Sequence, residues 1–206
     1  MFKGHRIIVI GDAHDAPNVS QERFKWIGKY INKSQPDYII QIGDWASMDS
    51  LSFFQKNSSQ AGKLKDAYMV DIDSLRSSID ILDKYIDNDR IPRHVTLGNH
   101  DRIIIRKAQS SDIPSKWIKE FSEVLETPNW NFVTEVYYDG VRYVHGDKSG
   151  KARMAAKRDM VSTVSGHDHT DFYCEWMFGK TRAIFGMAVG CGIDSKSYAM
   201  GYMQGG

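Results

Sequence analysis

The sequence predicts a single α/β domain, and three observations support this prediction. Short apolar runs typical of buried strands alternate with amphipathic helical patterns in the first half of the chain. In the second half the strand-like runs become mostly consecutive, which indicates a second group of strands. The length of 206 residues with 41% hydrophobic content is enough for one sizeable core. We therefore expect one domain over residues 1–206.

The first half consists of strands that each lead into a loop and a helix. The run RIIVIGDAH from Arg6 predicts a buried strand and a glycine-containing loop, and a helix follows with apolar positions Phe24, Ile27, Tyr30 and Ile31. The run YIIQIGDW from Tyr38 precedes a longer helix marked by Ile72, Leu75, Ile79, Leu82 and Ile86. A third strand is predicted at HVTLGNHD, from His94. The polar stretch 47–66, between the second strand and the longer helix, predicts a surface loop with one short helix that could overhang a site.

The second half is richer in strands. Trp117, Phe121 and Leu125 have the spacing of another amphipathic helix. The run NFVTEVYYDGVRYVHGD then predicts a hairpin that turns at Asp139 and Gly140. VSTVSGHDH predicts a further strand, and FYCEWMFG and TRAIFGMAVG predict a strand pair with its turn at Gly179 and Lys180.

Composition excludes few partners by itself. Lys and Arg number 27 against 26 Asp and Glu, so the net charge of +1 indicates no global attraction to nucleic acid or membranes. No apolar run is long enough for a signal core or a membrane span, so we expect a cytoplasmic protein with no membrane partner. Cys174 and Cys191 fit no zinc-finger spacing, and buried free thiols are expected, with a disulfide as the alternative.

Polar clusters follow the carboxyl ends of the predicted strands, where open α/β sheets bind ligands. The clusters contain five of the seven histidines, and together they comprise Asp12, His14, Asp44, Asn99, His100, His145, His167 and His169. An isolated His-x-His pair is more often solvated or satisfied in a core than a metal site, but the clustering favours metal ligands. Oxygen and nitrogen donors without thiolates suit manganese, iron or zinc, and this many donors indicates two ions.

Five motifs, GDAH, GD, GNHD, HG and GHDH, occur in this order between residues 11 and 169. The set resembles the motifs of the calcineurin-like metallophosphoesterases. Among the members of this family, it is most similar to the small ones of bacteriophages and bacteria. A phage-encoded protein would act in the host cytoplasm. The resemblance implies a four-layer α/β/β/α sandwich with two divalent metal ions, Mn²⁺ first, with Fe, Zn or Ni as alternatives. It further implies that one metal is held by Asp12, His14, Asp44 and His169, and the other by Asp44, Asn99, His145 and His167. Asp44 would bridge them.

The implied chemistry suits these residue types. Two ions about 3.5 to 4 Å apart can lower the pKa of a shared water and direct the resulting metal-bridging hydroxide at phosphorus. The resemblance places His100 at the phosphate, where an imidazole can assist the leaving group as the catalytic acid. Asp101 either orients an imidazole or caps the helix that follows it.

Departures from the family pattern bear on the substrate. Protein phosphatases of this family have an Asp-Arg pair after the second motif, whereas Asp44 is followed here by WASMDSLSFF. The missing pair favours phosphodiesters, such as nucleotides, cyclic nucleotides or related esters. Asp15 stands where many relatives have glycine, and a solvated loop carboxylate is expected in preference to a substrate contact.

Local basic residues leave the nucleic acid question open. DKSGKARMAAKRD, from Asp147, either contacts phosphate or forms a solvated helix face with Met154, Ala155 and Ala156 turned inward. Arg102 is the better phosphate candidate, so the expected substrate contacts are Asn99, His100 and Arg102. A metal-dependent phosphodiesterase is thus the first hypothesis, a DNA or RNA nuclease the alternative, and a non-catalytic scaffold the third.

Overall fold

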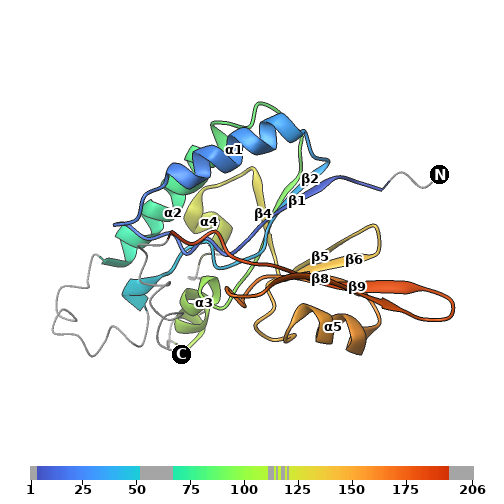
Figure 1. The fold of residues 1–206 in the computed structure, drawn as a ribbon. Coiled ribbons are helices and arrows are strands. Elements are labelled where there is room, and N and C mark those ends of the chain that lie inside the picture. The colour runs from blue at the N-terminus through green and yellow to red at the C-terminus, as the bar shows by residue number, and fades with distance from the viewer. Residues whose placement is uncertain are drawn as a thin grey trace.

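A computed structural model describes residues 4–51, 67–110, 114, 116, 119 and 121–194. Two β-sheets lie against each other (Figure 1). Helices α1 (Glu22–Ser34) and α2 (Ala67–Asp83) lie on one side of the pair, and α5 (Ala152–Asp159) lies on the other. This is the four-layer α/β/β/α sandwich that the family resemblance implies.

The first sheet is parallel, and its four strands lie side by side in chain order. They are β1 (Ile7–Ile10), β2 (Tyr38–Gln41), β3 (Arg93–Thr96) and β4 (Trp130–Val133). A core between this sheet and its helices joins Phe24, Ile72 and Leu125 to Ile39 and Val95. These helices are α1 (Glu22–Ser34), α2 (Ala67–Asp83) and α4 (Phe121–Leu125). The predicted apolar positions Ile72, Leu75, Ile79 and Leu82 are therefore buried by α2, whereas Ile86 is buried but lies beyond the end of that helix.

The second sheet is mixed, with strand order β5-β6-β7-β9-β8. Its strands are β5 (Glu135–Tyr138), β6 (Val141–Val144), β7 (Ser162–Ser165), β8 (Phe172–Phe178) and β9 (Ala183–Val189). Ile40 and Ile42 pack with Tyr143 and Val164 between the two sheets. Two further helices complete the described part, η1 (Asp49–Leu51) and α3 (Asp101–Gln109).

Helix α5 (Ala152–Asp159) covers the outer face of the second sheet through alanines. Ala152, Ala155 and Ala156 are buried. A Cβ atom at Gly186 of β9 would lie 2.4 Å from the Cα of Arg153, so glycine permits this close approach. The prediction that Met154 points inward is wrong, because its side chain is 58% exposed. Small side chains, not methionine, fit the narrow contact.

The predicted hairpin at 131–147 is correct only for the two strands on either side of the turn. β5 and β6 pair antiparallel, and Asp139 and Gly140 turn between them with φ of 52° and 75°. The preceding residues 130–133 form β4, which pairs in parallel with β3 in the other sheet. Continuous strand-like sequence does not show this change of sheet, because both segments have the same side-chain alternation.

The cysteine prediction is partly wrong. Cys174 and Cys191 are free thiols, as expected, but Cys174 is exposed on β8 and Cys191 is only half-buried. The reason is that β8 is an edge strand, so the residues around Cys174 have a neighbouring strand, β9, on one side only. Trp117 and residues 52–66 of the predicted loop lie outside the described residues. None of the described helices is both long and apolar enough to cross a membrane.

Candidate metal centre

The polar clusters predicted at the strand ends do come together. Their chain segments follow β1, β2, β3, β6 and β7, whose carboxyl ends point to the same end of the sandwich. Three sets of side chains each bring their ligand atoms within 4.8 Å of one another: Asp12, His14 and His169; His14, Asp44 and His100; and Asp44, His145 and His167. Asp44 belongs to the second and third of these sets, and His14 belongs to the first and second.

The shortest distances run through Asp44 and His14. Asp44 Oδ2 lies 3.2 Å from His145 Nε2 and 3.7 Å from His14 Nε2. His14 Nε2 is 3.1 Å from His169 Nε2, which in turn lies 3.3 Å from Asp12 Oδ2. Asn99 Oδ1 is 3.0 Å from His145 Nε2. Every residue predicted as a metal ligand thus has a short contact to another predicted ligand, and His167 makes its contact through its backbone N–H, which lies 2.9 Å from Asp12 Oδ2.

The donor atoms fit a cation. Asp12 Oδ1 is buried and has no hydrogen-bond partner among the described residues. His145 Nδ1 lies 2.9 Å from the carbonyl oxygen of Ile42, to which it donates, so in the neutral ring Nε2 presents a lone pair to Asn99 and Asp44. Lone pairs that converge in a buried space repel one another unless a proton or a metal ion lies between them. The arrangement therefore fits divalent metal ions.

Backbone geometry at the ligands explains the glycines of the motifs. A Cβ atom at Gly98 would lie 2.1 Å from Asp44 Oδ1, and one at Gly166 would lie 2.1 Å from Asp12 Oδ1. Only glycine leaves room for these carboxylates. His14, Asp44 and His167 themselves have left-handed backbones, with φ of 43°, 49° and 69°. This conformation is uncommon for non-glycine residues, which adopt it at turns, at helix ends and at functional sites.

Burial and mutual charge set the protonation of the centre. Burial lowers the pKa of His14 to about 3, so this imidazole is neutral and able to bind metal. Burial opposes the charged forms of both Asp44 and His145, but their hydrogen bond and opposite charges outweigh it. The pair therefore lowers the pKa of Asp44 and raises the pKa of His145 to about 9. Burial raises the pKa of Asp12.

Comparison with known protein families agrees with this geometry. The profile of the calcineurin-like phosphoesterases, Metallophos, matches residues 5–183. The chain belongs to the calcineurin-like phosphoesterase family. No curated protein matches the chain.

His100 lies beside the candidate ligands of this calcineurin-like phosphoesterase. Its Nδ1 is 2.6 Å from the carbonyl oxygen of Ser47, and its backbone N–H donates to Asp44 Oδ1 at 2.8 Å. The His14 and His100 rings meet edge to face, with centroids 4.6 Å apart. Because Ser47 fixes Nδ1, Nε2 is the ring nitrogen left for a substrate or an ion.

Asp101 and Arg102 have structural contacts. The backbone N–H groups of Asp44 and Gly98 both donate to Asp101 Oδ2 at 2.8 Å, so Asp101 fixes two ligand-bearing loops. The described structure shows no hydrogen bond from Asp101 to an imidazole, and burial raises its pKa to about 6. Arg102 donates to the carbonyl oxygen of Leu97 at 2.8 Å and pairs with Asp147. Its role at the phosphate stays a prediction.

Asp15 is not a solvated loop carboxylate, and that expectation is wrong. Its side chain is buried and accepts hydrogen bonds from Ser74 at 2.7 Å, Gln21 at 2.9 Å and Arg23 at 3.0 Å. Its backbone carbonyl accepts the N–H of Ser47 at 2.9 Å. Asp15 therefore connects the loop after β1 to α1, α2 and the residue that positions His100.

Sequence analysis missed the Asp15 network and the role of Ser47. A charged residue beside the motif ligands was the available signal for Asp15. Nothing in the pattern of α1 marks Arg23 as its partner, because the residue resembles any cation on a helix. Ser47 acts through its carbonyl oxygen, which every residue type provides.

We expect Asp15→Asn to destabilise the phosphoesterase by about 3 kcal/mol, because it removes the carboxylate that is hydrogen-bonded to the half-buried Arg23 guanidinium. Urea unfolding measures this change. Glu22→Gln is the matched control: it removes a carboxylate from the exposed Glu22–Lys25 pair and should cost less than about 1 kcal/mol. Equal losses in the two variants would contradict the structural role of Asp15.

Asp44→Asn should reduce metal affinity at every site of the centre, because one side chain borders two ligand sets. Substitutions beyond the ligands already cost about 10- to 100-fold in metal affinity, so loss of a charged ligand should cost at least as much. Titration calorimetry and metal analysis of the purified variant check this. Asp168→Asn, a carboxylate between His167 and His169 but outside the ligand sets, should bind metal like the wild type. Full metal content in Asp44→Asn would contradict the shared position.

Proposed function

We propose that this chain is a phosphodiesterase that hydrolyses a nucleotide, a cyclic nucleotide or a related phosphodiester with two divalent ions, Mn²⁺ first. Its family makes it a metal-dependent phosphoester hydrolase. The preference for diesters, the number of ions and their identity are the parts that we infer.

The segment after Asp44 is the observation that carries the diester preference. Trp45 and Met48 are buried in the core, and Ser47 lies against His14. None of the residues from 45 to 51 is a cation, and Arg102 is already paired with Asp147. A phosphomonoester carries a second negative charge near neutral pH, which a nearby arginine would stabilise. A diester with a single charge needs no such residue.

The ligand residues have distinct tasks in this proposal. Asp12, His14 and His169 would hold one ion, Asn99, His145 and His167 the other, and Asp44 would contact both. When bound, the ions supply Lewis acidity, which lowers the pKa of a water and withdraws charge from the phosphate. The chain's own contribution is to hold the ligands in place: Ile42 orients His145, Asp101 fixes the loop of Asp44, and the N–H of His167 donates to Asp12 Oδ2 at 2.9 Å.

His100 would act on the leaving group. With Nδ1–H donating to Ser47, the protonated ring presents Nε2–H to the ester oxygen that departs. General acid catalysis by a positioned imidazole typically contributes about 10²- to 10⁴-fold. Asn99, next to His100, adds a polar contact without cancelling the positive charge that attracts the substrate.

A substrate panel with Mn²⁺ tests the proposal. We expect a higher kcat/KM for bis-p-nitrophenyl phosphate than for p-nitrophenyl phosphate, with cyclic nucleotides and single-stranded DNA as further diesters. Activity should vanish with a chelator and return with added metal. Undiminished hydrolysis by metal-free protein would contradict metal dependence, and a preference for the monoester would contradict the diester assignment.

His100→Ala should separate catalysis from metal binding. We expect kcat to fall about 10²- to 10⁴-fold for an ester with a nucleoside leaving group, because protonation of that oxygen is lost. A nitrophenolate leaves without a proton, so the loss should be smaller for bis-p-nitrophenyl phosphate. Metal content should stay at the wild-type level, and the exposed His5→Ala serves as control. Wild-type rates on both esters would show that His100 has another role.

A further inference from the structure

Three aromatic side chains form an exposed row on β8. Phe172, Trp176 and Phe178 are 80%, 54% and 82% exposed. Their even spacing along the strand puts them on one face of the sheet, with Cys174 between them. We call Phe172, Trp176 and Phe178 the aromatic row. Large apolar side chains gathered in this way on a surface indicate a binding site.

The row is exposed because the sandwich core ends at β9. Phe185, Met187 and Val189 of β9 pack between the two sheets, whereas no residue of β8 belongs to that core. β8 pairs with β9 alone and is the last strand of its sheet, and the β8–β9 hairpin projects from the sandwich (Figure 1).

The aromatic row begins at the metal centre. Phe172 follows the ligand His169 after two residues and pairs with Val189, whose strand leads to the bridge between Cys191 and Asp12. Trp176 and Phe178 lie farther out, with ring planes 23° apart and centroids separated by 6.3 Å. Nearly parallel rings suit ligands that are themselves stacked in parallel planes, as successive nucleic acid bases are.

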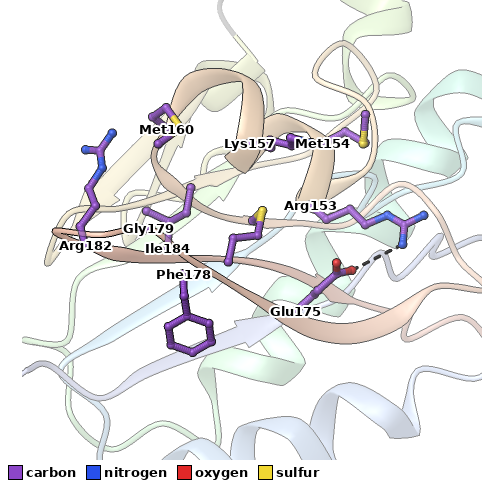
Figure 2. A pocket seen from close by; sticks show the side chains of 10 residues that line it. Arg153, Met154, Lys157, Met160, Glu175, Phe178, Gly179, Arg182 and Ile184 are labelled. Atoms are coloured by element: carbon purple, nitrogen blue, oxygen red, sulfur yellow. Dashed lines mark hydrogen bonds and ion pairs between the residues drawn. The ribbon is translucent and has the colours of Figure 1, made fainter.

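Cations lie on the opposite side of the same hairpin. Arg153, Lys157 and Arg182 surround a cavity of about 420 Å³ between α5 and the hairpin, and Phe178 points away from Lys157 and Met160 (Figure 2). Arg153 pairs with Glu175 of β8 at 3.4 Å. In the described structure Lys157 and Arg182 have no carboxylate partner. Because β8 is an edge strand, an extended ligand that lies along its free edge can contact both faces of the sheet.

The charge of this region is unusual for the chain. Seven lysines and arginines but only four carboxylates occur from residue 148 to residue 182, although the whole chain has a net charge of +1. Three of these cations pair with Asp171, Glu175 and Asp159, which leaves four cations and one carboxylate in this segment. A polyanion with planar bases would match both this charge and the aromatic side chains.

We propose that the aromatic row binds a single strand of nucleic acid, whose bases stack on Phe172, Trp176 and Phe178 while its phosphates lie toward the cations beside β8. The strand would thereby reach the metal centre, so this inference deepens the proposed phosphodiesterase function and rests on it. It makes the natural diester part of a polynucleotide instead of a free small molecule.

Oligonucleotide binding without hydrolysis tests the row separately from the metal centre. Fluorescence anisotropy of a labelled oligothymidylate in chelator and low salt gives Kd for the folded protein. We expect Trp176→Ala and Phe178→Ala each to raise Kd about tenfold, since a stacked base contributes on that order. Trp26→Ala is the matched control, because it removes a tryptophan that is 65% exposed on α1, and should leave Kd unchanged. Added salt should raise Kd for the wild type.

Different outcomes identify which idea fails. Absence of oligothymidylate binding by the wild type, or equal loss in Trp26→Ala, would overturn the nucleic acid site. A wild-type dimer that Trp176→Ala dissociates, with no oligonucleotide bound, would make the row an interface between copies and would also overturn it. Hydrolysis of bis-p-nitrophenyl phosphate by the wild type is measured in parallel: its failure contradicts the phosphodiesterase alone, because binding in chelator needs no reaction.

Discussion

The burial of the Asp44 carboxylate is the constraint on which the rest of the centre depends. A charge in a protein interior is costly unless other groups compensate it. Here the backbone of His100 donates to one oxygen, His145 contacts the other, and Asp101 holds the loop by its backbone. These partners follow two strands, β3 of the first sheet and β6 of the second, so the carboxylate brings strand ends of both sheets to one point.

Strain at the same point is stabilised by the surrounding fold. His14, in the loop after β1, and Asp44, in the loop after β2, both adopt left-handed backbone conformations. Hydrogen bonds join the two loops, because the backbone N–H groups of Ala13 and His14 both donate to the carbonyl oxygen of Asp44. The buried Asp15–Arg23 pair then ties these loops to α1 and α2. The geometry of the candidate ligands thus depends on helix packing outside the centre itself, which is a common way to keep a site rigid.

The two ends of β8 differ in what covers them. Near Phe172 the strand adjoins the metal centre, and toward Phe178 it extends beyond the core as an edge with aromatic side chains on one face. Natural edge strands are often blocked by charges or by another element. The cations beside β8 provide charge, and they also make the edge suitable for an anionic ligand. Substrate access and protection from aggregation can therefore share one surface.

The sequence by itself determined the fold class, the family and the grouping of candidate ligands, because glycine-flanked polar residues after buried strands identify a strand-end site, and five ordered motifs identify its family. It did not determine the sheet change between β4 and β5, the burial of Asp15 or the exposure of Cys174. Alternation along a strand is the same in either sheet, and a carboxylate beside a motif looks alike whether solvated or paired. Only the tertiary structure decided these points, because each depends on what a distant part of the chain places beside the segment. Arg23 and Ser74 lie beside Asp15, and β9 is the strand that pairs with β8.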